Sequence, residues 1–133
     1  MLLKNDIDNL KKIVNNEILT DSAELCCYAE DSTNTKTELQ KPDLVIFPES
    51  IEDVQRILKY ANDHKIPVVS RGAGTNMVGA CTCPKAGIVI CFTKMNKILD
   101  FNSIDMTMTV QPGVVLDDIK KLAASEGLFY PPD

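Results

Sequence analysis

Apolar residues recur along this chain with two different spacings, and the first of these predicts helices near the amino terminus. Residues 6–15 carry apolar side chains at helical spacing, which predicts an amphipathic helix. Thr20 or Asp21 is suited to cap a second, short helix that runs toward Cys26. The polar stretch over residues 30–43 has no periodic pattern and predicts an irregular connection.

The middle of the chain has the pattern of a strand, a helix and a second strand. Leu44–Phe47 is a continuous apolar run, as expected for a strand buried on both faces. Ser50 is suited to cap the helix that follows. The apolar stripe predicted for that helix consists of Ile51, Val54, Ile57, Leu58 and Ala61. Pro67–Val69 then predicts the second strand, which completes a βαβ unit.

Three further strands and a last helix are predicted in the remainder. Gly87–Phe92 is another continuous apolar run, and Met106–Gln111 alternates apolar with polar residues. The predicted strands are Gly87–Phe92, Lys97–Phe101 and Met106–Gln111, with a turn at 102–105 between the last two. A helix over residues 115–126 is expected to stop at Gly127. This mixed order predicts an α+β or α/β fold.

The composition fits one folded domain and excludes several kinds of partner. The 133 residues are 44% hydrophobic and 25% charged, which is enough to form a core. The 14 Lys and Arg residues and 19 Asp and Glu residues give a net charge of −5, which disfavours nucleic acid and anionic membranes. Aromatic residues amount to 5%, so a stacking platform for single-stranded nucleic acid is not expected.

The pattern of apolar residues and cysteines predicts a cytoplasmic protein with reduced thiols. The first residues lack the apolar stretch of a signal peptide, and no apolar run is long enough for a transmembrane segment. An odd number of cysteines without a secretion signal favours free thiols. Cys81 and Cys83 form one close pair and His64 is the single histidine, so the spacing predicts no metal site.

The segment with candidate chemistry is Ser70–Gly79, which follows a predicted buried strand. In α/β sheets, ligands bind at the edge where such strands end. Gly72 and Gly74 can adopt a positive φ, and successive amides in such a turn can form an anion-binding concavity. Arg71 adds a cation. These are the groups that a pyrophosphate needs.

The two common nucleotide motifs do not fit this segment. The dinucleotide motif G-x-G-x-x-G would need glycine at Met77. The phosphate-binding motif G-x-x-x-x-G-K-[ST] would need Lys at Ala80 and Ser or Thr at Cys81. From the residue types alone, a purely structural glycine turn is therefore the favoured interpretation.

The segment Ser70–Asn76 nevertheless resembles the FAD pyrophosphate loop of the vanillyl-alcohol oxidase / p-cresol methylhydroxylase flavoprotein superfamily. Further segments that resemble this family are Lys41–Val45, Ile51–Val54, Gly87–Val89, Met95–Leu99, Val110–Val114 and Leu128–Asp133. Together they cover nearly all of residues 20–133 in the order expected for the family. The resemblance is to the glycolate oxidase / D-lactate dehydrogenase branch of FAD-linked oxidases.

The resemblance implies an α+β FAD-binding domain of the p-cresol methylhydroxylase type. Its first lobe, which contains the βαβ unit, would be complete and its second lobe truncated. Residues 1–40 would form a helical segment and irregular lead-in. Residues 41–133 would be the N-terminal part of the FAD-binding domain, without the substrate cap domain.

The resemblance also implies which residues bind FAD. They are Ser70, Arg71, Gly72, Ala73, Gly74, Thr75 and Asn76 around the pyrophosphate, Gly79 close to the cofactor, and Pro131, Pro132 and Asp133 near the flavin. Ala73 and Asn76 stand where many members have Gly, and a positive φ at Ala73 would be strained. Thr75 stands at about the place of the flavin-linked histidine of some members, so non-covalent FAD is expected.

The activity that the resemblance implies is oxidation of a small 2-hydroxy acid, such as glycolate or D-lactate, with hydride transfer to FAD. An electron-transfer flavoprotein, an iron–sulfur subunit or a quinone would accept the electrons. No catalytic residue is recognisable here, because in the family these residues come from later segments. Residues 1–133 alone are expected to be inactive and to retain little FAD. The alternatives are a non-catalytic FAD- or nucleotide-binding module, an electron-transfer subunit, or another flavoenzyme on the same scaffold.

Overall fold

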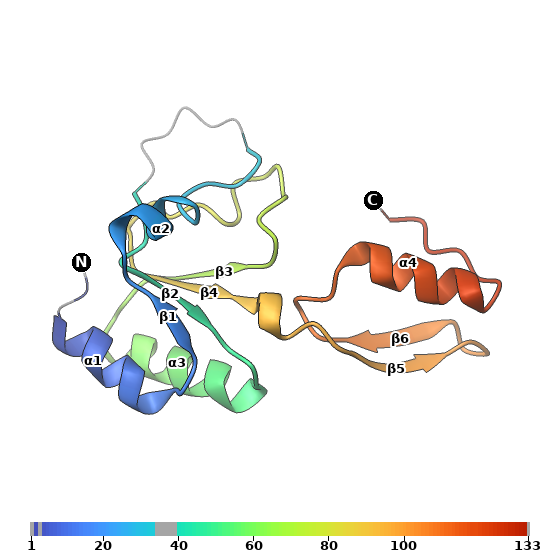
Figure 1. The fold of residues 1–133 in the computed structure, drawn as a ribbon, viewed down its shortest axis with the longest axis horizontal. Helices are drawn as coiled ribbons and strands as arrows, with labels where there is room; N and C mark the ends of the chain where they lie inside the picture. Colours follow the sequence, from blue (N-terminus) through green and yellow to red (C-terminus); the bar gives the residue numbers. More distant parts are fainter. Residues whose placement is uncertain (1, 3, 34–39, 133) are drawn as a thin grey trace.

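The computed structural model describes residues 2, 4–33 and 40–132, which form two lobes joined by a short connection (Figure 1). The first lobe contains a four-stranded sheet with helices on both faces, and the second contains a two-stranded sheet with one helix. The connection includes the short 3-10 helix η1 (Phe92–Lys94). The predicted mixture of helices and strands is therefore confirmed.

The sheet of the first lobe has a mixed strand order. Its strands lie in the order β1 (Glu17–Leu19), β2 (Leu44–Phe47), β4 (Ile88–Cys91) and β3 (Val68–Arg71). β1 is antiparallel to β2, whereas β2, β4 and β3 are parallel. Every residue of β2 and β4 is buried, which confirms the prediction from their apolar runs. The pattern predicted neither β1 nor the insertion of β4 between the two strands of the βαβ unit.

The two faces of this sheet form separate cores, because alternate residues of a strand point to opposite faces. Helices α1 (Lys4–Ile13) and α3 (Ile51–Asp63) cover one face, against side chains such as Leu44 and Ile88. The other face is covered by α2 (Ser22–Cys26), whose Leu25 belongs to a cluster with Val45, Phe47, Cys83, Val89 and Cys91. The glycine-rich segment leaves the sheet on the side of α2 (Figure 1).

The predicted helix α3 is present, but its buried face differs in part from the prediction. Ser50 caps the helix as predicted, because its side chain accepts a hydrogen bond of 3.1 Å from the Asp53 N–H. Ile51 and Leu58 are 72% and 46% exposed, so their placement in the buried stripe was wrong. Tyr60 is buried on that face instead.

The second lobe consists of a hairpin and a helix. β5 (Ile98–Asn102) pairs with β6 (Thr107–Val110) in antiparallel fashion, and α4 (Leu116–Ser125) follows. Gly127 follows the end of α4 and adopts a left-handed conformation, with φ of 72°, as predicted for a helix stop. Met106 precedes β6 and is 74% exposed, whereas Met108 and Val110 within the strand are partly buried.

The connection between the lobes is fixed by a close approach of two backbone segments. The Gly113 N–H donates to the Met95 carbonyl at 2.8 Å. A Cβ atom on Gly113 would lie 1.9 Å from the Phe92 carbonyl oxygen, so only glycine fits here. The turn after β6 is thereby held against the segment that leaves the first lobe.

Candidate functional site

The glycine loop, residues 70–79, begins in β3 and continues beyond the carboxyl end of that strand. Within the described residues, the main-chain N–H groups of residues 73–77 donate no hydrogen bond. Gly74 lies in the middle of this run and has a φ of 77°. Successive N–H groups around a left-handed residue form a concavity that binds anions. The loop therefore offers donors that an anionic group can occupy.

The Arg71 side chain packs against Gly74 in the middle of this run and is hydrogen-bonded to Glu30. Its Nη1 donates to the Glu30 carbonyl at 2.7 Å, and its guanidinium carbon lies 5.5 Å from the centroid of the Tyr28 ring. A Cβ atom on Gly74 would lie 2.1 Å from Arg71 Nη2. The guanidinium thus contributes positive charge next to the loop while it is hydrogen-bonded to the preceding segment.

Asn76 organises the second half of the loop. Its Oδ1 accepts hydrogen bonds of 3.2 Å from the Val78 and Ala80 N–H groups. Its Nδ2 lies 3.0 Å from the Cys81 sulfur. The side chain amide is therefore engaged inside the loop, and the anion-binding groups of Asn76 are limited to its main-chain N–H.

The remaining predicted residues of the loop fall into exposed positions and turns. Ser70, Ala73 and Thr75 are exposed. Gly72 has no atom within 4 Å of the position of a Cβ. Neither Ala73 nor Asn76 has a positive φ, so the strain considered for Ala73 does not arise. Gly79 does adopt the left-handed conformation, with φ of 73°.

A segment whose sequence predicts only an irregular connection lies against the glycine loop. The Gly79 N–H donates to Thr33 Oγ1 at 2.6 Å, and the Cys81 N–H donates to Asp31 Oδ2 at 3.2 Å. The Ser32 N–H donates to the Asn76 carbonyl at 3.1 Å. A hydrogen bond with the Thr33 side chain is the largest cause of the lowered pKa of the Asp31 carboxyl group. The pattern Asp31-x-Thr33 is the local signal for such a turn, but nothing in it indicates the partner.

The three C-terminal residues of the predicted site lie in the second lobe. Pro131 and Pro132 are exposed and follow Tyr130 at the end of the described chain, and Asp133 lies outside the described residues. In the part of the chain that the structure describes, no hydrogen bond joins residues 128–132 to the glycine loop. The described residues therefore bring residues 70–79 together but do not join Pro131 and Pro132 to them.

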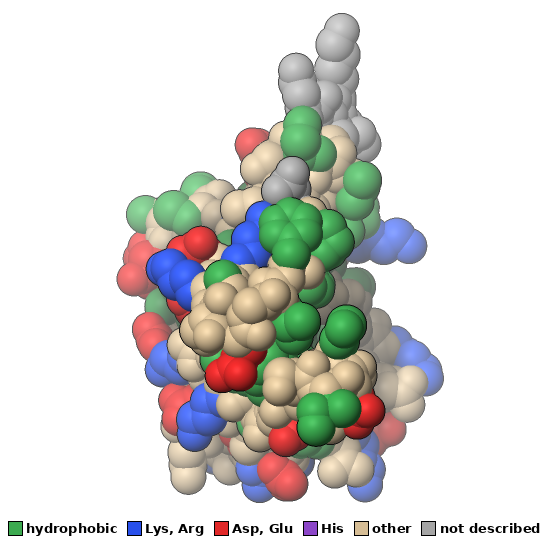
Figure 2. All heavy atoms as spheres, turned by 90° about the vertical axis from the view of Figure 1, so that its right-hand side faces the viewer, with side chains coloured by type: hydrophobic (Ala, Val, Ile, Leu, Met, Phe, Trp, Pro, Cys, Tyr) green, Lys and Arg blue, Asp and Glu red, His purple; other side chains and the backbone are tan. Residues whose placement is uncertain are grey.

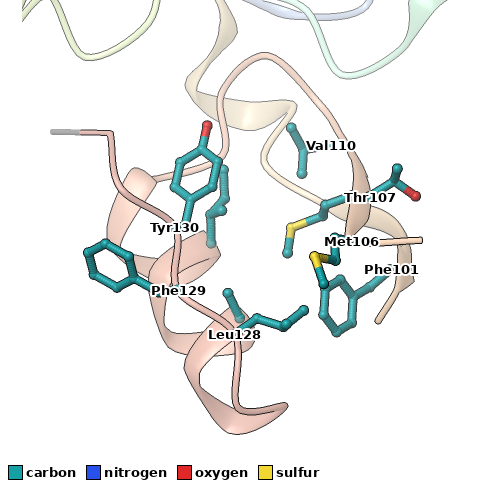
Figure 3. A pocket seen from close by; sticks show the side chains of 10 residues that line it. Phe101, Met106, Thr107, Val110, Leu128, Phe129 and Tyr130 are labelled. Atoms are coloured by element: carbon teal, nitrogen blue, oxygen red, sulfur yellow. The ribbon is translucent and has the colours of Figure 1, made fainter. Parts of the chain in front are cut away.

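A hollow lies in the second lobe, between its hairpin and α4. It has a volume of about 290 Å³, and Figure 3 shows Met106, Leu128 and Phe101 around it. Its lining residues are Phe101, Met106, Thr107, Met108, Val110, Ile119, Ala123, Leu128, Phe129 and Tyr130. Figure 2 shows apolar side chains gathered on this side of the molecule. No charged group lines the hollow, so it does not suit a pyrophosphate.

A family model described as "FAD binding domain" matches residues 42–133, which include the glycine loop, both strands that flank it and the second lobe. The chain belongs to this FAD-binding family. The solved structure of p-cresol methylhydroxylase shares the fold, with a TM-score of 0.77 and 21% identity over 96% of this chain and 26% of that chain. The predicted α+β fold of the p-cresol methylhydroxylase type is thus confirmed.

Curated proteins are similar to nearly the whole chain. D-2-hydroxyglutarate dehydrogenase of Stutzerimonas stutzeri is 40% identical over 128 residues, which are 96% of this chain and 27% of that protein. Glycolate oxidase subunit GlcD of Bacillus subtilis is 39% identical over 135 residues, which are 100% of this chain and 28% of that protein. The chain therefore spans about a quarter of the length of these relatives.

Two of the cysteines contact the glycine loop: the Cys81 sulfur lies 3.0 Å from Asn76 Nδ2, and the Cys91 sulfur lies 3.8 Å from the Gly72 carbonyl oxygen. All five are free thiols, and Cys81, Cys83 and Cys91 are buried. Burial raises the pKa of the Cys83 thiol, so it stays protonated at neutral pH. Among the described residues, no group of three or more metal-ligating side chains is placed to hold an ion. No helix in the described ranges has the length and apolar character needed to cross a membrane.

Proposed function

We propose that this chain is the N-terminal FAD-binding part of a longer flavin-dependent oxidoreductase that oxidises a small 2-hydroxy acid. The observation that carries the proposal is the run of free N–H groups at residues 73–77 in a chain of the FAD-binding family. The names of the similar proteins, a D-2-hydroxyglutarate dehydrogenase and a glycolate oxidase subunit, support a 2-hydroxy acid as the substrate class.

In this proposal the glycine loop binds the FAD pyrophosphate through its main chain. The free N–H groups of residues 73–77 donate to the phosphate oxygens, and the exposed Thr75 hydroxyl adds a donor. Gly74 supplies the left-handed conformation at the centre of this run, and Gly72 precedes it in the same loop. Ser70 lies at the start of the loop, and the left-handed Gly79 closes its far end.

Arg71 supports the same pyrophosphate by its charge rather than by a direct contact. Its Nη1 is occupied by the Glu30 carbonyl, and the rest of the guanidinium lies under Gly74. A positive charge beneath the donors strengthens their attraction for a phosphate. Pro131, Pro132 and Asp133 are proposed to lie near the flavin ring, and residues 41–133 to form the first part of the FAD-binding domain. Residues 1–40 are proposed as its helical lead-in.

When bound, FAD supplies the acceptor for the hydride that leaves the substrate carbon. The residues of this chain hold the cofactor in place and contribute the field around its phosphates. FAD is proposed to be non-covalent, because Thr75 cannot form the link that a histidine forms in some flavoproteins. An electron-transfer flavoprotein or an iron–sulfur subunit is proposed as the electron acceptor, and the cytoplasm as the compartment, which the five free thiols support.

The proposal is tested by purifying the whole protein that carries this chain and recording its visible absorbance. We expect flavin bands that are released as free FAD on denaturation, which identifies non-covalent binding. Anaerobic addition of glycolate, D-lactate or D-2-hydroxyglutarate should bleach these bands within one turnover. A protein that contains no flavin and takes up none from added FAD would overturn the proposal.

The same measurement separates the enzyme from the alternatives. A protein that binds FAD but is bleached by none of the three hydroxy acids would be a non-catalytic FAD-binding module, an electron-transfer subunit or a flavoenzyme for another substrate. Reduction of the bound flavin by dithionite is the control, because it shows that the flavin is competent to accept electrons. Transfer of electrons from the reduced protein to a purified electron-transfer flavoprotein then tests the proposed acceptor.

A further inference from the structure

Residues 30–33, which we call the clasp, form hydrogen bonds at both ends of the glycine loop. At the start of the loop, the Glu30 carbonyl accepts a hydrogen bond of 2.7 Å from Arg71 Nη1. Beyond the run of free N–H groups, the clasp accepts hydrogen bonds from the Gly79 and Cys81 N–H groups. These three hydrogen bonds join residues that are 41 to 50 positions apart in sequence. They lie on either side of the run of free N–H groups.

The clasp occupies the N–H groups that follow the proposed phosphate donors and leaves those donors free. The N–H groups of Gly79 and Cys81 are bonded to Thr33 and Asp31, whereas residues 73–77 have no acceptor among the described residues. The Ser32 N–H also donates to the Asn76 carbonyl, so this acceptor within the run is occupied. This division between occupied and free donors is what a pre-organised anion site requires, because little ordering remains for the moment of binding.

The position of a carboxylate beside this loop needs a physical reason. A negative charge near an anion site lowers the affinity of the site unless other interactions compensate. Both oxygens of Asp31 accept main-chain hydrogen bonds, from Thr33 at 2.9 Å and from Cys81 at 3.2 Å. The carboxylate therefore acts on the backbone of the loop, and charge-assisted bonds of this kind are the stronger ones.

We infer that Asp31 and Thr33 are positioning residues that hold the glycine loop in its dinucleotide-binding conformation. Thr33 fixes Gly79, Asp31 fixes Cys81 and the turn that presents the Thr33 hydroxyl, and together they keep the N–H groups of residues 73–77 available. The inference rests on the proposed function for the identity of the ligand, FAD. The hydrogen bonds themselves are independent of that identity.

The test uses two matched sets of variants in the whole protein. Thr33→Val removes the hydroxyl at nearly unchanged volume, whereas Thr33→Ser retains it and should rescue the function. Asp31→Asn removes the charge and replaces one acceptor oxygen with a donor. Asp8→Asn is the control for the loss of one negative charge, because Asp8 is exposed on α1, away from the loop.

Two readouts are compared for each variant. Hydrogen–deuterium exchange of the flavin-free protein, followed in peptides that cover residues 76–83, reports whether the loop is held. Titration with FAD, followed by flavin fluorescence, reports the dissociation constant. We expect Thr33→Val and Asp31→Asn to speed exchange in these peptides and to weaken FAD binding by about two- to tenfold, the range for loss of one hydrogen bond. Thr33→Ser and Asp8→Asn should match the unchanged protein in both.

Every other result contradicts the inference and shows which of its steps fails. Unchanged exchange in both variants would show that the clasp does not hold the loop. Faster exchange with unchanged FAD affinity would show that the held conformation does not matter for the dinucleotide. If the unchanged protein takes up no FAD, the proposed function fails and the dinucleotide role of the clasp fails with it. FAD uptake that no variant affects overturns the clasp alone.

Discussion

Gly74 satisfies two constraints that no other residue in the glycine loop combines. Its φ of 77° is unfavourable for any residue with a Cβ, and the Arg71 guanidinium occupies the space that a Cβ would need. Gly72, two residues earlier, has open space beside it and no positive φ. The two glycines of the motif therefore have different physical roles, although they look equivalent in the sequence.

This difference predicts opposite results for two alanine substitutions. Gly74→Ala places a Cβ 2.1 Å from Arg71 Nη2, so it should displace the guanidinium or the loop and weaken FAD binding by about tenfold or more. Gly72→Ala should change FAD binding by less than about threefold, because its Cβ meets no atom within 4 Å. Titration of both variants with FAD measures the contrast, and equal affinities would contradict this account of the loop.

The Asp31 carboxylate accepts a hydrogen bond from the Cys81 N–H, so the stability of this part of the chain should depend on pH. The hydrogen bond with Thr33 is the largest influence on its pKa and lowers it from the ordinary value of 3.8. A lowered pKa in the folded state means that this stabilisation is complete above pH 3.8 and is lost as the pH falls through the folded value. Protection of residues 76–83 from hydrogen exchange, corrected for intrinsic rates, should be constant from neutral pH to about 5. It should decline only below the unfolded value, and Asp31→Asn should abolish this dependence.

At the scale of elements, the sequence pattern predicted those with a run or a regular repeat of apolar residues. The runs that form β2 and β4, the helices α1, α3 and α4, and the hairpin of the second lobe all have such patterns. β1 contains three residues with one exposed and two partly buried positions, so it carries no period for a pattern to reveal. The insertion of β4 between β2 and β3 is a tertiary choice that local spacing does not encode.

The candidate site, too, could be predicted from the sequence only in part. The glycine loop is recognisable from its residues, but its partners Asp31 and Thr33 are 50 and 46 residues away from the groups that they bind. Contacts over such separations leave no local pattern, so the clasp could not be predicted from the sequence. Ile51 and Leu58 match the helical period of α3 yet are exposed, because the sheet covers only the face that includes Ile57 and Ala61.

The turn that enters β4 yields a prediction about stability. Gly87 has a φ of 96°, and a Cβ there would lie 2.4 Å from the Pro67 carbonyl oxygen. Gly87→Ala should lower the free energy of unfolding by about 3 kcal/mol, because it adds a backbone clash to left-handed strain. Gly127→Ala, with φ of 72° but no atom within 4 Å, should cost only about 1 kcal/mol of left-handed strain. Urea unfolding measures both, and similar losses would refute the steric part of the argument.

At the scale of the whole molecule, the charge distribution and the two lobes define what the chain can bind. A net charge of −5 gives the chain no overall attraction for phosphates, so the proposed pyrophosphate site depends on local N–H groups and Arg71. No charged residue lines the apolar hollow of the second lobe, so the hollow contributes no charge to that site. The relation between the lobes rests on the short connection through η1 and on Gly113.

Gly113 therefore gives the prediction that belongs to this scale. Gly113→Ala would place a Cβ 1.9 Å from the Phe92 carbonyl oxygen, and both partners are backbone, so the turn after β6 must move away from the connection. The hydrogen bond from Gly113 to Met95 is then lost. Trypsin should cut at the exposed Lys94 and Lys97, which flank Met95, several-fold faster in this variant. Gly127→Ala in the same lobe is the control, since it leaves the connection intact, and an unchanged cleavage rate in Gly113→Ala would show that this contact does not hold the lobes together.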